Sequence, residues 1–153
     1  MKSKNEQLLI SHLRQDGRAR LTTISKKTRI PVSTLFDMLK KTEKITKQTC
    51  LADFSKFGYT VRATIILKTI AEHRDELRSN LLKNPNTNSL WKINNGFDFM
   101  SEMIFRNISE LEYFIEDLEK KYQIVEKNIY YIIDDIAREI FMSNPDNMKL
   151  FDL

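Results

Sequence analysis

Apolar residues in the first part of the chain recur at the spacing of short amphipathic helices. The pattern predicts a first helix over residues 5–15, closed by a left-handed cap at Gly17. A second helix is expected to be capped by Thr22 or Thr23 and to run to Lys27. Each of these helices turns its apolar residues inward and leaves its charged residues outside.

A third helix follows a break at residues 29–31 and begins at Ser33 or Thr34. Its apolar positions recur at i, i+3 and i+4, and they are Leu35, Met38 and Leu39. Two short helices joined by a turn of three or four residues form the pattern of a helix-turn-helix, so duplex DNA is the first partner to test. Residues 45–51 then alternate and predict a short strand or the remnant of a wing.

The pattern changes near residue 60, where β-branched residues become frequent. Strands are predicted over residues 60–69, 89–94, 97–106 and 124–133, and helices over residues 72–83 and 109–121. The turn signal Asn94-Asn95-Gly96 joins the two middle strands into a hairpin. A capping box from Ser109 to Glu112 opens the last helix. The order βαββαβ predicts a small split-βαβ sheet with its helices on one side.

These elements predict an α+β fold in which an amino-terminal winged helix-turn-helix is joined to a carboxy-terminal ferredoxin-like βαββαβ domain. The length of 153 residues suits two small domains that associate through an interface. The expected boundaries are residues 1–51 for the helix-turn-helix domain, 52–60 for a linker or hinge, 61–142 for the βαββαβ domain and 143–153 for a tail.

Charge divides the chain in the same place. Residues 1–60 hold 13 Lys and Arg against 5 Asp and Glu, whereas residues 61–153 hold 12 against 16. A basic amino-terminal half attracts phosphates, and an acidic carboxy-terminal half is repelled by the same duplex and is free for another task. The alternative is a lysine-rich chain whose charged faces are merely solvated.

Several protein classes are excluded by composition. No apolar run reaches the roughly 18 residues that span a bilayer, and the opening residues lack the long apolar segment of a secretion signal. Cys50 stands alone, which excludes an internal disulfide, and His12 and His73 lie too far apart along the chain for a Cys/His zinc finger. We expect a soluble, cytoplasmic, non-enzymatic protein without metal or cofactor.

The third predicted helix supplies the candidates for base contacts. Ser33 and Thr34 can bond to bases or phosphates, Asp37 can accept from a cytosine amino group, and Lys41 can reach guanine or a phosphate. Phe36 either packs under the wing or touches a thymine methyl group. Basic residues nearby are candidates for phosphate contacts, with solvated charge as the alternative: Arg14, Arg18, Arg20, Lys26, Lys27, Lys40 and Lys44.

The order of elements, with a "DGR" segment near the first helix and "DFSKFGY" leading into the strand ATIILK, resembles the leucine-responsive regulatory protein/AsnC family of transcription regulators. The resemblance covers nearly the whole chain. It implies a DNA-binding domain followed by an effector-sensing domain that dimerises through its sheet. It also implies that dimers can assemble further into octamers, with an amino acid or similar small metabolite bound between dimers.

The chain departs from the family pattern at several positions. Arg29 stands where the family commonly has glycine in the helix-turn-helix turn, so this arginine must accept an unusual backbone or form a different turn. The basic pair usual in the third helix is replaced by Asp37 and Met38, and the glycine that leads into the wing is missing after residues 42–44. The DNA sequence preferred by relatives therefore does not transfer to this chain.

The hairpin loop holds the candidate effector site. Asp98 can pair with the ammonium group of an amino acid, and Asn95 and Gly96, with Asn94, can add amide and backbone bonds. The alternative for Asp98 is a residue that caps the turn. Trp91, beside this loop, is expected in the core rather than as a wall of the ligand site.

Two other functions are compatible with the predicted architecture. Decarboxylases of the sirohaem pathway share it and use histidines and arginines to hold a tetrapyrrole, but His12 and His73 form no clustered pair in this sequence. A chromatin-organising protein would use the same basic helices with little sequence preference. The favoured reading is a dimeric regulator whose third helices enter major grooves about 34 Å apart on one face of the DNA.

Overall fold

The computed structural model describes residues 2–150, which form two compact units. The helical unit contains the residues up to Leu51 together with those from Ile136 onward, and the sheet unit contains residues 52–135. The carboxy-terminal residues from Ile136 onward thus make most of their contacts with the helical unit and not with the sheet unit. No helix among residues 2–150 is both long and apolar enough to cross a membrane.

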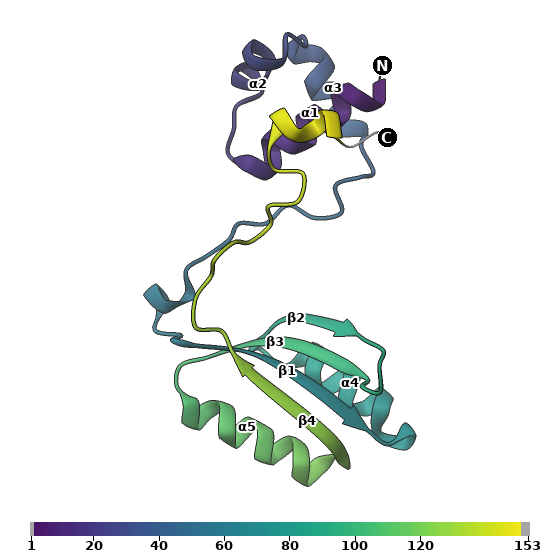
Figure 1. The fold of residues 1–153 in the computed structure, drawn as a ribbon, viewed down its shortest axis with the longest axis vertical. Helices are drawn as coiled ribbons and strands as arrows, with labels where there is room; N and C mark the ends of the chain where they lie inside the picture. Colours follow the sequence, from purple (N-terminus) through teal and green to yellow (C-terminus); the bar gives the residue numbers. More distant parts are fainter. Residues whose placement is uncertain (1, 151–153) are drawn as a thin grey trace. The chain divides into compact units, whose positions relative to one another are not determined.

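Three short helices build the core of the helical unit (Figure 1). They are α1 (Lys2–Gln15), α2 (Leu21–Thr28) and α3 (Val32–Lys41). Each contributes apolar residues to one buried cluster made of Leu9, Ile24, Ile30 and Leu35. The three helices predicted by apolar periodicity are confirmed, because residues spaced three or four apart share one face of a helix and meet here in one core.

The ends of the first two helices differ from the prediction. Gly17 is absent from the residues with a positive φ, so the expected left-handed cap is wrong, and α1 ends instead with the Asp16 amide bonded to the His12 carbonyl at 2.9 Å. The expected caps of α2, Thr22 or Thr23, are also wrong. Arg20 occupies the N-cap of α2, and its side chain makes no capping hydrogen bond.

The turn between α2 and α3 depends on Arg29. This residue is the C-cap of α2 and has φ 61° and ψ 21°, which is the left-handed region that favours glycine. Its amide donates to the carbonyl of Ser25 at 2.8 Å. The helix-turn-helix therefore keeps the turn that a glycine would form, with an arginine in the strained position.

The predicted strand over residues 45–51 is wrong. These residues, all within the described part of the chain, have no regular secondary structure, and Cys50 is exposed. The side of α1 is covered instead by the end of the chain, where the 3₁₀ helix η3 (Pro145–Leu150) contacts α1. Arg14 of α1 also binds the residues just before η3. It donates a hydrogen bond to the Phe141 carbonyl at 2.7 Å and forms an ion pair with Glu139 at 2.9 Å.

The sheet unit is the predicted βαββαβ arrangement. Its strands are β1 (Val61–Thr69), β2 (Thr87–Lys92), β3 (Phe99–Phe105) and β4 (Ile124–Tyr131), and its helices are α4 (Arg74–Lys83) and α5 (Ile108–Lys121). Short 3₁₀ helices η1 (Phe54–Phe57) and η2 (Ala71–His73) precede β1 and α4. The strands run antiparallel in the order β2-β3-β1-β4, which confirms the α+β prediction.

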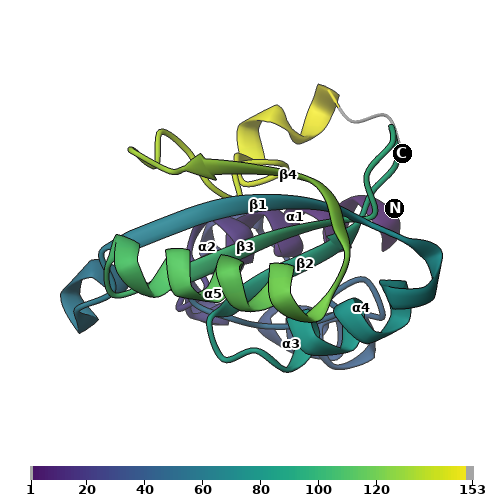
Figure 2. The ribbon, with the colours of Figure 1, turned by 90° about the horizontal axis from the view of Figure 1, so that it is seen from below.

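Both helices of the sheet unit lie on one face of the sheet, as Figure 2 shows. Alternate residues of β1 point to this face, and Ala63, Ile65 and Leu67 are completely or almost completely buried there. They join Leu77 and Leu81 of α4 in the core, with Leu111, Ile115 and Leu118 of α5. The other face of the sheet has no helix of this unit over it.

The hairpin turn is confirmed, but the predicted capping box is displaced. Asn95 has φ 62° and Gly96 has φ 88°, the positive values that an Asn-Gly turn requires. The N-cap of α5 is Asn107, whose side-chain oxygen accepts from the Glu110 amide at 2.9 Å. The N-cap therefore lies two residues before Ser109, because Asn107 offers the same type of cap.

Candidate DNA-binding surface and effector loop

The third helix, α3, has one buried and one solvent-facing side. Leu35 is completely buried, whereas Ser33, Asp37, Lys40 and Lys41 are exposed and Thr34 is half-buried. The helix thus brings together the four candidates for base contacts, Ser33, Thr34, Asp37 and Lys41, with the phosphate candidate Lys40. Residues 45–51, which lie within the described part of the chain, form no strand that could cover Phe36 as a wing, and Phe36 is 57% exposed.

The second helix and the loop before it present further positive charge. Arg18, Arg20, Lys26 and Lys27 are exposed, and within residues 2–150 their side chains make no hydrogen bond or ion pair. These four predicted phosphate contacts are therefore free to meet an external anion. An exposed lysine or arginine loses little by exchanging water for a phosphate oxygen.

Two predicted phosphate contacts already have partners inside the helical unit. Lys44 forms an ion pair with Glu6 at 2.7 Å, and Arg14 is bonded to the carboxy-terminal segment as described above. The hydrogen bond from Lys44, with another from Thr42, lowers the pKa of the Glu6 carboxyl. Both cations would have to leave a carboxylate to reach DNA, so they are weaker candidates than Lys40 and Lys41.

The hairpin loop brings the candidate effector residues together, but Asp98 is already engaged. Its carboxylate accepts from the Thr69 amide at 2.9 Å and pairs with Arg74 at 2.6 Å, and its side chain is only 12% exposed. These bonds fasten the hairpin to the end of β1 and the start of α4. Asn95 and Gly96 are exposed at the tip of the same loop.

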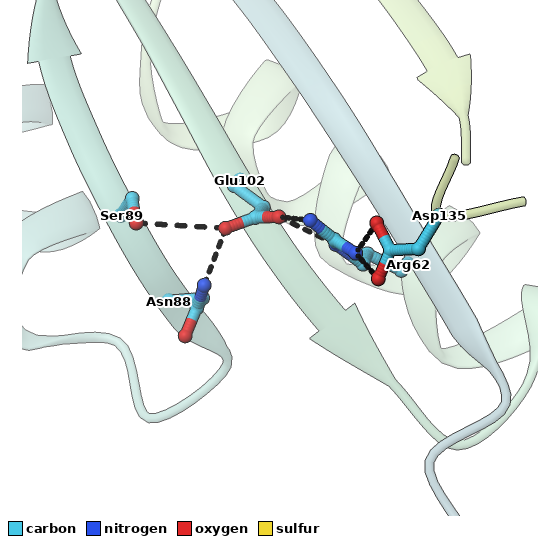
Figure 3. A network of polar contacts seen from close by, with 5 residues as sticks. All are labelled: Arg62, Asn88, Ser89, Glu102 and Asp135. Atoms are coloured by element: carbon cyan, nitrogen blue, oxygen red, sulfur yellow. Dashed lines mark hydrogen bonds and ion pairs between the residues drawn. The ribbon is translucent and has the colours of Figure 1, made fainter. Parts of the chain in front are cut away.

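Sequence reasoning missed a polar network on the open face of the sheet, drawn in Figure 3. Glu102 of β3 is buried and accepts hydrogen bonds from Arg62, Asn88 and Ser89. Arg62 also pairs with both carboxylate oxygens of Asp135. The signal was present in the sequence, because Glu102 is a lone charge within the apolar strand FMSEMIF.

The guanidinium of Arg62 and the carboxylates of Glu102 and Asp135 stabilise one another in their charged forms. Burial alone lowers the pKa of the Arg62 guanidinium, but its bonds to Asp135 and Glu102 outweigh that effect and raise the pKa. Both carboxylates are thus held beside a guanidinium that stays charged. The network joins three strands and the residues just after β4 into one polar cluster.

Apolar side chains surround this cluster on the same open face. Trp91 pairs with Met100 across the sheet, and Tyr130 pairs with Thr64, which places all four side chains on the face without helices. The expectation that Trp91 lies in the core is wrong, because it is 45% exposed, and Tyr130 is 57% exposed. Large exposed aromatic residues on one face of a sheet are typical of an interaction surface.

The two histidines lie in different units. His12 belongs to α1 of the helical unit, whereas His73 ends η2 of the sheet unit and accepts a hydrogen bond from the Gln123 amide at 3.0 Å through Nδ1. His73 also packs edge-on against the ring of Tyr122. These contacts give His73 a structural role at the start of α4.

Comparisons with known proteins agree with the architecture. No family model matches the chain. The HTH-type transcriptional regulator FL11 of Pyrococcus horikoshii is 31% identical over 111 residues, which cover 71% of this chain and 74% of that protein. The FL11 regulator of Pyrococcus abyssi is 30% identical over 111 residues, with the same coverage.

Solved structures share the fold at low sequence identity. A Neisseria meningitidis transcriptional regulator in complex with L-methionine aligns with a TM-score of 0.78 and 14% identity, over 88% of this chain and 91% of that one. LrpC of Bacillus subtilis aligns with a TM-score of 0.76 and 17% identity, over 87% and 95%. The order of helices and strands, the helix-turn-helix and the similarity to the FL11 regulators place the chain in the leucine-responsive regulatory protein/AsnC family of transcriptional regulators.

Proposed function

We propose that this chain is a sequence-specific DNA-binding regulator that acts in the cytoplasm as a homodimer, without enzymatic activity, and that a small metabolite modulates its operator binding. The observation that carries the proposal is α3, whose exposed side gathers Ser33, Asp37, Lys40 and Lys41 opposite the buried Leu35. A helix with one side fixed in a core and the other side polar and basic suits the major groove.

We expect α3 and α2 to make different kinds of DNA contact, because their exposed side chains differ. The hydroxyl and carboxylate groups of Ser33, Thr34 and Asp37 carry the donors and acceptors that distinguish base pairs. Lysines at the end of α3 and the free cations of α2 supply phosphate contacts, which set position and affinity but not sequence. Because Asp37 and Met38 replace the basic pair that is usual in this helix of the family, we expect the preferred DNA site to differ from those of relatives.

DNA binding is tested by the salt dependence of a paired-lysine variant. Replacing Lys40 and Lys41 with alanine should weaken binding to all sequences and lower the salt slope by up to about two. The matched control is the double replacement of Lys120 and Lys121, which removes the same charge from α5, where both lysines pair with acidic residues of their own helix. An equal loss of DNA affinity in both variants would mean that only the net charge of the protein matters. An unchanged salt slope in the Lys40/Lys41 variant would show that these lysines of α3 do not contact phosphate.

Sequence specificity is tested by binding to fragments of the protein's own genome at physiological salt with excess competitor DNA. A protected site with about 10 base pairs of internal periodicity is the expected result, because two symmetric helices enter successive major grooves. Binding that disappears into the competitor would favour a chromatin-organising protein.

The open face of the sheet supports the proposed homodimer. It carries Trp91 and Tyr130 around the Glu102 network, and a second copy could cover both aromatic side chains at once. Replacing Trp91 with glutamate should give monomers in size-exclusion chromatography with light scattering. The matched control is Tyr113, an aromatic residue of α5 that is 71% exposed away from the sheet, and its replacement should leave the assembly unchanged. We further propose that dimers join into octamers, whose larger mass the same experiment would detect.

The exposed loop at Asn95 and Gly96 supports an effector site for an amino acid. The relative from Neisseria meningitidis was solved with L-methionine, and Asp98 offers a carboxylate for an ammonium group. Because Arg74 already pairs with Asp98, a ligand must displace this guanidinium. Calorimetry with a panel of amino acids should therefore detect tighter binding to an Arg74→Gln variant than to the unaltered protein, and no binding to either would leave the regulator without this effector.

A further inference from the structure

A hollow of about 400 Å³ lies in the helical unit where the end of α1 meets the start of α2. Four basic side chains line it: His12, Arg18, Arg20 and Lys27. The one acidic residue of its wall is Asp16, whose carboxylate is partly occupied by a hydrogen bond from the Arg18 amide at 2.9 Å. The hollow is thus a concave, open and predominantly cationic site.

We propose that this hollow seats a phosphate of the DNA backbone and that His12 binds this phosphate in its protonated form, so that DNA binding takes up a proton. The inference rests on the proposed function, because it names a contact within the same DNA interface. It adds a residue of α1, and a dependence on pH, to a surface otherwise made of arginines and lysines.

The position of the hollow favours a backbone phosphate over a base. In a helix-turn-helix the helix before the recognition helix crosses the DNA backbone, and Arg20 and Lys27 of this wall belong to the start and end of α2. No side chain caps the start of α2, so an anion near Arg20 also meets amide groups of the first helical turn. Phosphate oxygens are the anions that a duplex presents at this place.

The charges around His12 explain why the proton would arrive with the phosphate. In the free protein, burial first and then the nearby charge of Lys27 lower the pKa of His12, while Asp146 of η3 raises it. Arg18 and Arg20 add positive charge to the same hollow, and Asp16 adds one negative charge. The imidazole is therefore neutral in the free protein at neutral pH.

A phosphate in the hollow reverses this balance. Its negative charge favours the imidazolium and offers an acceptor for the N–H of His12, so the pKa of His12 rises on binding. Between the free and the bound pKa, the complex holds one more proton than the separate partners. By linkage, affinity then increases as the pH falls through that window, by at most tenfold for each pH unit.

The first test measures the DNA dissociation constant from pH 5.5 to pH 8 at constant ionic strength for three proteins. The chain has two histidines, so His12→Gln removes the proposed group and His73→Gln is a matched control in the other unit. The unaltered protein and the control should bind roughly three to ten times more tightly at the acidic end. The His12→Gln variant should lose that difference, and an equal pH dependence in all three proteins would overturn the inference.

A second variant keeps the test valid if His12→Gln fails to fold. Lys27→Gln removes the charge that lowers the pKa of His12, so the pH dependence should move to higher pH while overall affinity falls. The His12 ring proton, followed by NMR with and without DNA, reports the pKa directly, and it should rise in the complex. A pKa of His12 that DNA leaves unchanged would overturn the inference.

Failure of the inference can be told apart from failure of the proposed function. Absence of DNA binding at every pH and salt concentration would contradict both. Binding to DNA without the His12 effect would leave the regulator intact and overturn only the phosphate contact. If inorganic phosphate or pyrophosphate shifts the His12 resonance at millimolar concentration but DNA does not, the hollow binds small anions, and the backbone contact proposed here is wrong.

Discussion

At the scale of single residues, Arg29 has a strained backbone in the turn of the helix-turn-helix. Residues other than glycine, asparagine and aspartate rarely adopt φ 61°, because their Cβ approaches the backbone. The surrounding turn accepts that cost, since the Arg29 amide closes α2 through its bond to Ser25. The arginine side chain is exposed, so its loss leaves no cavity.

Replacing Arg29 with glycine should therefore stabilise the helical unit by about 1 kcal/mol, because glycine adopts the left-handed region without the Cβ clash. Urea denaturation followed by circular dichroism would measure the change. Arg29→Ala is the matched control, since alanine removes the same guanidinium but keeps a Cβ. A gain in the alanine variant as large as in the glycine variant would mean that charge, and not backbone strain, is responsible.

For individual residues, the sequence could predict exposure but not the hydrogen-bond partners of side chains that meet across the sheet. The unusual backbone at Arg29 was one of the two alternatives left open by its departure from the family pattern, and the exposure of Lys40 and Lys41 followed from helical periodicity. The partners of Asp98 did not follow, because Thr69 and Arg74 approach it only once the sheet is assembled. The same holds for Arg62, Glu102 and Asp135, which are distant in sequence and meet across strands.

At the scale of elements, periodicity predicted the helices and the strands of the sheet, but it did not predict where each begins, and it added a strand over residues 45–51 that does not form. The start of a helix depends on one side chain that bonds to a free amide, and several residues near each start could do so. For α5 the chain offered Asn107 and Ser109 two residues apart, and the structure uses Asn107. The strand expected over residues 45–51 failed for another reason, since a short alternating segment forms a strand only where it finds a partner strand.

The cap of α5 can be tested by exchanging its two candidate residues. Asn107→Ala should destabilise the sheet unit by about 1 kcal/mol, because the Glu110 amide loses its acceptor at the start of the helix. Ser109→Ala should change stability little, since Ser109 is exposed and lies inside the helix. Thermal unfolding of both variants gives the comparison, and a larger loss at Ser109 would restore the capping box predicted from the sequence.

At the scale of the whole molecule, the chain leaves the helical unit after Leu51 and returns to it from Ile136. Sequence patterns did not reveal this return, because residues 136–150 have no amphipathic period and contain only a short 3₁₀ helix. Their attachment depends on Arg14 and on Met148, which is 6% exposed. The segment therefore acts as a fourth element of the helical unit.

A chain ending at Asp135 should consequently keep a stable sheet unit and lose stability in its helical unit. Burial of Met148 contributes about 2 kcal/mol, whereas the exposed pair of Arg14 and Glu139 contributes less than about 1 kcal/mol. Calorimetry should show the helical transition at lower temperature in the shortened chain, with the sheet transition unchanged because Asp135 still pairs with Arg62. Arg14→Gln in the full chain separates the two contributions, since it removes the hydrogen bonds and leaves Met148 in place. If Arg14→Gln lowered the helical transition as far as the truncation does, the polar contacts and not the buried methionine would hold the returning segment to α1.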